Sequence, residues 1–170
     1  MLLNALKITY PNYNENNIGT YPLSFTELFI LNNHAMNLSD IGCSAEAVVI
    51  YEELIKKIYN FNDDYEKERM YSPVLINYST CLGRLERRRE ALAIIEKGES
   101  FNSEQKCLFV LPGLYFNKGY NLFKLGDKEV SIPYFIMAYY GNSMFARYGK
   151  SIHLSAVEKF IIEEMNINLL

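Results

Sequence analysis

Residues 24–58 read SFTELFILNNHAMNLSDIGCSAEAVVIYEELIKKI. Ser24 and Glu27 have the spacing of a capping box, in which the serine oxygen accepts from the backbone amide three residues on and the glutamate reaches back. Gly42 suits the left-handed backbone of a helix end. The sequence therefore predicts a helix that begins near Ser24 and ends at Gly42. Its apolar residues recur every three or four positions, on one helical face: Leu28, Leu31, Ala35 and Leu38.

A second helix is predicted from Ser44, where a new apolar stripe begins. Only a few residues separate the two stripes, so the two helices should form an antiparallel helical hairpin. The stripe consists of Ala47, Val48, Tyr51, Leu54, Ile55 and Ile58.

The same pattern recurs twice, with turns expected at Gly83–Arg89 and at Gly126. Ala47, Ala91 and Ser131 are equivalent positions in the three copies, with offsets of 44 and 40 residues. A tetratricopeptide repeat has about 34 residues. The helices or the loops must therefore be longer, and residues 59–66 and 98–104 are the expected places for the surplus.

These patterns predict an all-α fold, a right-handed superhelical α-solenoid of three divergent tetratricopeptide-like helix pairs in a single domain, residues 1–170. Residues 11–22 are rich in Asn, Gly and Pro and read as a loop. Whether Pro73, Pro112 and Pro133 kink their helices or begin them stays open. The predicted segments are 1–8, the end of a preceding helix; 24–60, 66–98 and 103–147, the three repeats; and 151–165, a helix that caps the stack.

Composition excludes several classes of protein. The chain has 170 residues, 49% hydrophobic and 22% charged, which is typical of a globular domain and not of disorder. A net charge of −3 argues against a surface that coats nucleic acid. No apolar run approaches the roughly 20 residues of a membrane span, and no signal peptide is evident. Three cysteines, Cys43, Cys81 and Cys107, form no C-x-x-C pair, so a reducing cytoplasm is expected.

The sequence offers no catalytic residue, cofactor site or metal site, so the chain is not expected to be an enzyme. It has neither a G-x-S-x-G motif nor a phosphate-binding glycine loop. Its two histidines, His34 and His153, lack a Cys, Asp or Glu at the spacing of a helical metal pair. Tyrosine and phenylalanine fall at helical spacing and are expected in the core. The basic residues of 84–89 are expected on a solvated surface.

The chain also resembles a known family. The words GCSAEAVVIY (42–51), RRREALAII (87–95) and, with serine for alanine, GDKEVSIPYF (126–135) resemble the tetratricopeptide signature. Across nearly its whole length the chain resembles the C-terminal region of XRE-type helix-turn-helix regulators, the group that includes peptide-responsive quorum-sensing receptors. The words that carry this likeness are ALKITYP (5–11), LSFTELFILN (23–32) and FNKGYNLFKLG (116–126).

The resemblance implies a cytoplasmic sensor region that receives a short linear peptide or protein segment and forms a homodimer. DNA would be bound only through a helix-turn-helix domain, which these residues do not contain. A ligand-independent dimerisation or scaffold module is the alternative.

Three asparagines are the candidate ligand contacts. Asn33, Asn77 and Asn117 each precede the equivalent alanine or serine by 14 positions, on the first helix of each pair. An amide offers donors and an acceptor, so such a ladder could hold the backbone of an extended peptide. The same asparagines could instead cap or hydrate the helices. On the same face follow Met36, Thr80 and Tyr120, and then Arg84 and Lys124, which could engage a carboxylate.

Overall fold

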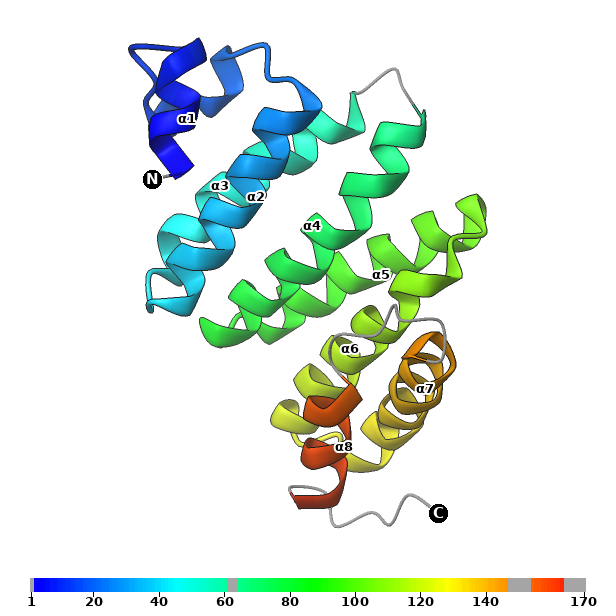
Figure 1. Ribbon diagram of the computed structural model, residues 1–170. Helices are drawn as coiled ribbons and strands as arrows, with labels where there is room; N and C mark the ends of the chain where they lie inside the picture. Colours follow the sequence, from blue (N-terminus) through cyan, green and yellow to red (C-terminus); the bar gives the residue numbers. More distant parts are fainter. Residues whose placement is uncertain (1, 61–63, 147–153, 164–170) are drawn as a thin grey trace. The chain divides into compact units, whose positions relative to one another are not determined.

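A computed structural model describes residues 2–60, 64–146 and 154–163 (Figure 1). Every regular element in these ranges is helical, which confirms the predicted all-α class. Contacts divide the chain into two compact units, unit 1 (Met1–Glu90) and unit 2 (Ala91–Leu170). The elements are α1 (Leu2–Thr9), the 3-10 helix η1 (Glu15–Thr20), α2 (Phe25–Asp40), α3 (Ser44–Tyr59), α4 (Asp64–Arg84), α5 (Arg88–Gln105), the 3-10 helix η2 (Leu108–Val110), α6 (Leu111–Leu125), α7 (Lys128–Ala146) and α8 (Leu154–Glu163).

Helix α2 begins with the predicted capping box. The Ser24 backbone N–H donates to Glu27 Oε2 at 2.8 Å, and the Glu27 N–H donates to Ser24 Oγ at 3.4 Å. Burial alone would raise the pKa of Glu27, but hydrogen bonds to its carboxylate from the Ser24 backbone N–H, the Ser24 hydroxyl and the Thr9 side chain hold the pKa below its usual value. Gly42 has a φ of 92° and α3 starts at Ser44, as predicted.

The second turn lies within the predicted range but is shorter, at residues 85–87. Gly83 and Arg84 still belong to α4, and α5 begins at Arg88, so the expected turn at Gly83–Arg89 is wrong at both ends. Gly83 is buried in the helix, and the left-handed residue of the turn is Glu86, with a φ of 60°. The third turn lies at Gly126 as predicted, and this glycine takes the left-handed conformation, with a φ of 97°.

The predicted loop at residues 11–22 contains η1 and is fastened to α3. The rings of Tyr10 and Tyr21 lie 5.1 Å apart, and the Tyr21 hydroxyl donates to the Asn12 carbonyl at 3.0 Å. Lys57 Nζ donates to the carbonyls of Gly19, at 3.0 Å, and Tyr21, at 2.6 Å. Lys57 thus ties the end of η1 and the residue that follows it to α3.

In unit 1, α3 packs against both α2 and α4, and α2 also contacts α4 (Figure 1). The apolar stripes predicted for α2 and α3 form much of the core, because Leu28, Leu31, Ala35, Tyr51 and Leu54 are at most 1% exposed. Burial of these stripes is the main stabilisation of unit 1.

In unit 2, α6 and α7 approach closely because each helix places a glycine against a side-chain ring of the other. A Cβ at Gly119 would lie 3.2 Å from the Phe135 ring, and a Cβ at Gly141 would lie 2.6 Å from Pro112 Cγ. Phe160 of α8 packs on the Phe135 ring with centroids 5.0 Å apart.

One of the three prolines begins its helix, and the other two lie inside theirs. Pro112 lies in the first turn of α6, whereas Pro73 and Pro133 lie inside α4 and α7. Residues 98–104 belong to α5, so the surplus there is a longer helix and not a loop. Helix α8 falls within the predicted capping segment. Residues 1, 61–63, 147, 151–153 and 164–165 of the predicted segments and loops, including His153, lie outside the described residues.

Candidate functional site

Helices α2 and α4 are parallel neighbours whose side chains meet at three levels. The contacts join residues 44 or 45 positions apart. They are Phe25 with Arg69, Asn32 with Asn77, and Ser39 and Asp40 with Arg84. Levels seven residues apart lie on one side of a helix, roughly 10 Å apart along the axis. We call these the apolar, amide and ionic levels of unit 1.

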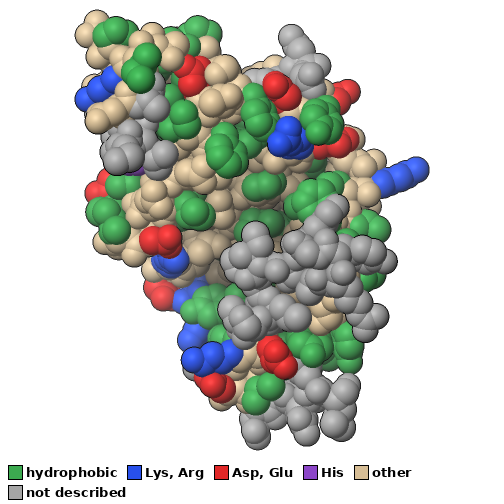
Figure 2. Space-filling model, viewed as in Figure 1, with side chains coloured by type: hydrophobic (Ala, Val, Ile, Leu, Met, Phe, Trp, Pro, Cys, Tyr) green, Lys and Arg blue, Asp and Glu red, His purple; other side chains and the backbone are tan. Residues whose placement is uncertain are grey.

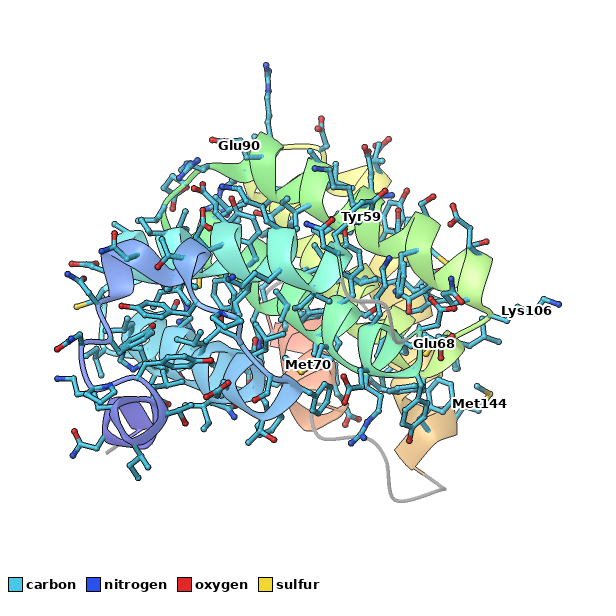
Figure 3. The ribbon with its side chains drawn as sticks, turned by 90° about the horizontal axis from the view of Figure 1, so that it is seen from above. Tyr59, Glu68, Met70, Glu90, Lys106 and Met144 are labelled. Carbon is cyan, nitrogen blue, oxygen red and sulfur yellow. The ribbon has the colours of Figure 1, made fainter. Side chains whose placement is uncertain are left out.

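The apolar level lies where both helices begin. The Arg69 guanidinium lies over the Phe25 ring, 5.3 Å from its centroid, and over the Tyr65 ring, at 5.4 Å. Met70 is buried, and Figure 3 shows its position on α4. A shallow depression too small to hold a water molecule lies here, lined by Phe25, Leu28, Ile58, Glu66 and Met70.

At the amide level, Asn77 Nδ2 donates to Asn32 Oδ1 at 3.1 Å. The Tyr51 hydroxyl of α3 donates to the Asn32 backbone carbonyl at 3.4 Å, which ties the third helix to the same point. Asn32 is 5% exposed, whereas Asn77 is half-buried. An amide has two N–H donors and an acceptor oxygen. The Asn32 bond occupies one donor of Asn77.

At the ionic level, Arg84 Nη1 donates to Ser39 Oγ at 2.6 Å and to Asp40 Oδ1 at 2.9 Å. Ser39 Oγ in turn lies 3.1 Å from Ser44 Oγ at the start of α3. Burial raises the pKa of the neighbouring Cys81 thiol, which disfavours the reactive thiolate form. Arg84 keeps a side chain that is 44% exposed, paired with the exposed Asp40.

The five predicted residues of unit 1 lie on two helices that contact each other. Asn33 and Met36 lie on α2, and Asn77, Thr80 and Arg84 lie on the contacting helix α4. All five are half-buried or exposed, and the Thr80 hydroxyl donates to the Ile76 carbonyl at 3.0 Å. We call these five residues the α2/α4 face. In Figure 2 the surface over α2 and α4 is mainly hydrophobic and neutral polar, with few charged side chains at its centre.

The other three predicted residues, Asn117, Tyr120 and Lys124, lie on α6 in unit 2. The Asn117 carbonyl accepts from Asn121 Nδ2 at 2.8 Å. Tyr120 belongs to an aromatic cluster, with its ring 5.5 Å from that of Phe160. Lys124 Nζ lies over the Tyr120 ring, 5.6 Å from its centroid. The predicted ladder thus has two asparagines in one unit and the third in the other.

Sequence reasoning missed Asn32, Ser39 and Asp40, which hold α4 against α2. The partner of Asn77 is Asn32, one residue before the asparagine that the repeat alignment singled out. The only signal for it was the neighbouring amide in the pair Asn32-Asn33.

Next to the amide level, two tyrosines stack across α3 and α4. The Tyr51 and Tyr78 rings lie 5.9 Å apart, and the Tyr78 hydroxyl donates to Glu52 Oε1 at 3.2 Å. Burial, together with the Glu52 charge, raises the pKa of Tyr78 to about 12. Burial also raises the pKa of Tyr51.

These shifts predict a loss of stability in alkali. The unfolded chain releases the Tyr78 proton near pH 10 and the folded chain near pH 12, so the stability present below pH 10 declines between these values. Tyr78→Phe should reduce that decline by up to about 1 kcal/mol per pH unit, less than the full linkage of one proton because solvent screens Glu52. Urea unfolding at intervals from pH 9 to pH 12 measures the slope. Tyr59→Phe is the control, since Tyr59 is 65% exposed, and equal slopes for the wild type and the Tyr78 variant would contradict the prediction.

Comparison with known protein families, curated proteins and solved structures finds no match to the chain. None of the helices in the described ranges has the length and apolar character needed to cross a bilayer. Among the residues that the structure describes, no three His, Cys, Asp or Glu side chains cluster as metal ligands would.

Proposed function

We propose that the chain is a peptide-binding module that holds an extended segment of another polypeptide along the α2/α4 face. The observation that carries the proposal is the parallel pairing of α2 and α4. Two of its contacts are made by Asn77 and Arg84, which lie two turns apart on α4. A peptide that runs along this pair would meet an apolar, an amide and an ionic group in sequence.

The chemistry of each level suits a part of a peptide. The half-buried Asn77 amide retains an N–H donor and its oxygen for a peptide backbone group. Arg84 binds Asp40 through Nη1, so its other guanidinium nitrogens can meet a peptide carboxylate. The depression beside Met70 is apolar apart from Glu66 and could receive an apolar side chain only after its walls move.

The packing order supports a tetratricopeptide-like arrangement as part of the proposal. In such a repeat the second helix of one pair packs on the first helix of the next, and successive first helices are neighbours. Contacts of α3 with α4, and of α2 with α4, follow this order. With the resemblance to XRE-type regulators, the proposed role is a cytoplasmic sensor region whose DNA-binding domain would be a separate part of the regulator.

The test uses peptides selected by the chain itself. Random seven-residue peptides displayed on phage are selected on the full chain, and an enriched peptide is titrated by calorimetry. Asn77→Ala should weaken binding about tenfold or more, because a hydrogen bond to the peptide backbone is lost. Asn60→Ala, an exposed asparagine at the end of α3, should leave binding unchanged. Failure to enrich any peptide, or equal affinity of wild type and the Asn77 variant, would refute the proposal.

A further inference from the structure

Helix α8 places an aromatic side chain against one side of α6 in unit 2 (Figure 1). The centroid of the Phe160 ring lies 5.9 Å from that of Phe116, 5.5 Å from that of Tyr120 and 5.7 Å from that of Phe123. These three residues of α6 are spaced by four and three positions, so they lie on one side of the helix. We call them the aromatic face of α6. The Phe135 ring of α7, at 5.0 Å, completes the surroundings of Phe160.

The aromatic face occurs only in the third helix pair. Two of its rings, Phe116 and Phe123, meet Phe160 edge to face, at 83° and 82°, which is a favourable geometry for aromatic pairs. None of the equivalent positions in the first two pairs, found with the offsets of 40 and 44 residues, is aromatic. They are Ile76, Thr80 and Gly83 on α4, and Asn32, Met36 and Ser39 on α2.

The side chains described on α8, those of residues 158–163, reach α6 and α7 through apolar contacts. Their one ion pair, Lys159 Nζ with Glu163 Oε2 at 3.8 Å, lies within α8. Phe160 and the three rings of the aromatic face are half-buried, so this contact lies at the surface of unit 2. A helix of ten residues is marginal by itself in water, so the helical form of α8 depends on its docking.

We propose that the aromatic face of α6 is a docking site for an amphipathic helix with a phenylalanine anchor. Its resident occupant is α8, which such a helix from another polypeptide displaces. The inward residues of α8 define the chemistry of the partner, because Phe160 is followed by the fully buried Ile161, whereas Lys159 is exposed. A partner helix therefore carries an aromatic and an aliphatic residue side by side on its apolar side.

The resident helix competes with any partner. Because α8 belongs to the same chain, its effective concentration at the aromatic face is on the order of millimolar. A helix of equal affinity that is added at micromolar concentration should therefore bind the wild type weakly. It should bind much better once α8 has lost its anchor.

The test uses the full chain and a fluorescent peptide with the sequence of residues 151–165, followed by fluorescence polarisation. Phe160→Ala in the chain should tighten binding of this peptide about tenfold or more, because the resident helix then competes less. Adding Phe123→Ala to that variant should remove the gain, since the peptide loses part of the aromatic face. Lys159→Ala alters a side chain of α8 that is 71% exposed and should leave the peptide affinity at the wild-type value.

Hydrogen exchange tests the release of α8 in the wild type, without any substitution. Amides of α8 should exchange about tenfold faster or more than the slowest amides of α6 and α7, because α8 opens while these two helices stay folded. In Phe160→Ala, circular dichroism should show a loss of helix no larger than the ten residues of α8.

Equal affinity of the peptide for the wild type and Phe160→Ala, or binding to neither, would overturn the proposal. Amides of α8 that exchange in step with those of α6 and α7 would also do so, since α8 would then be a fixed part of the core. Asn77→Ala should leave the binding of this peptide unchanged. Failure of this proposal is therefore distinguishable from failure of peptide binding at the α2/α4 face.

Discussion

Replacing Phe135 with alanine is expected to lower the free energy of unfolding of unit 2 by about 3–5 kcal/mol. The side chain is 0% exposed and lies at the centre of the aromatic cluster of unit 2. Its ring contacts those of Phe116, with centroids 5.8 Å apart, and Phe160, at 5.0 Å. The α6 backbone at Gly119 fits against the same ring. Removing the ring therefore leaves a cavity that the helices cannot close without shifting.

Hydrogen exchange measures this effect locally. Amides of α6 and α7 that exchange only on unfolding should exchange roughly a hundredfold faster or more in Phe135→Ala, because each 1.4 kcal/mol is a factor of ten. Phe135→Leu retains most of the volume and should cost about 1–2 kcal/mol. Equal exchange in the alanine and leucine variants would show that the ring does not fill a closed core.

Tyr51→Ala should destabilise unit 1 by about 3–5 kcal/mol, comparable to the loss of other large core rings. Tyr51 is 0% exposed, its ring stacks on Tyr78, and its hydroxyl reaches the Asn32 carbonyl. The substitution opens a cavity where α3 supports both α2 and α4. It should therefore also loosen the bond between Asn32 and Asn77.

Tyr51→Phe separates packing from hydrogen bonding. It keeps the ring and loses only a long hydrogen bond of 3.4 Å, so the expected cost is about 0.5–1.5 kcal/mol. Urea unfolding followed by far-UV circular dichroism compares the two variants. A phenylalanine variant as unstable as the alanine variant would assign the effect to the hydroxyl and contradict the packing explanation.

Local signals in the sequence predicted the start of α2 and two of the turns. The capping box of Ser24 and Glu27 forms because both partners lie within one helical turn, so the sequence spacing alone determines the geometry. Gly42 and Gly126 take positive φ values because a glycine without Cβ adopts them at little cost. Gly83 was expected to begin the second turn, but it is buried inside α4, and Glu86 takes the left-handed position instead.

Contacts between repeats were harder to predict. Aligning the copies finds equivalent positions, such as Asn33 and Asn77, and places them on the same side of their helices. Two parallel helices in the same orientation face each other with opposite sides, so they cannot touch through equivalent positions. The Asn77 side chain accordingly meets Asn32, and Asn33 remains beside that contact on the α2/α4 face. Which residues pair across two helices depends on how the helices pack, and an alignment of the repeats does not show it.

The three levels that join α2 to α4 restrict how this part of the chain can vary in length. Each inserted or deleted residue turns the rest of a helix by about 100°, so a single deletion between Phe25 and Asn32 would swing Asn32, Ser39 and Asp40 away from α4 together. A change of seven residues restores nearly the same direction, about 20° short. Viable length variants of unit 1 should therefore place their insertions in the turns, or add and remove two helical turns at a time in both helices.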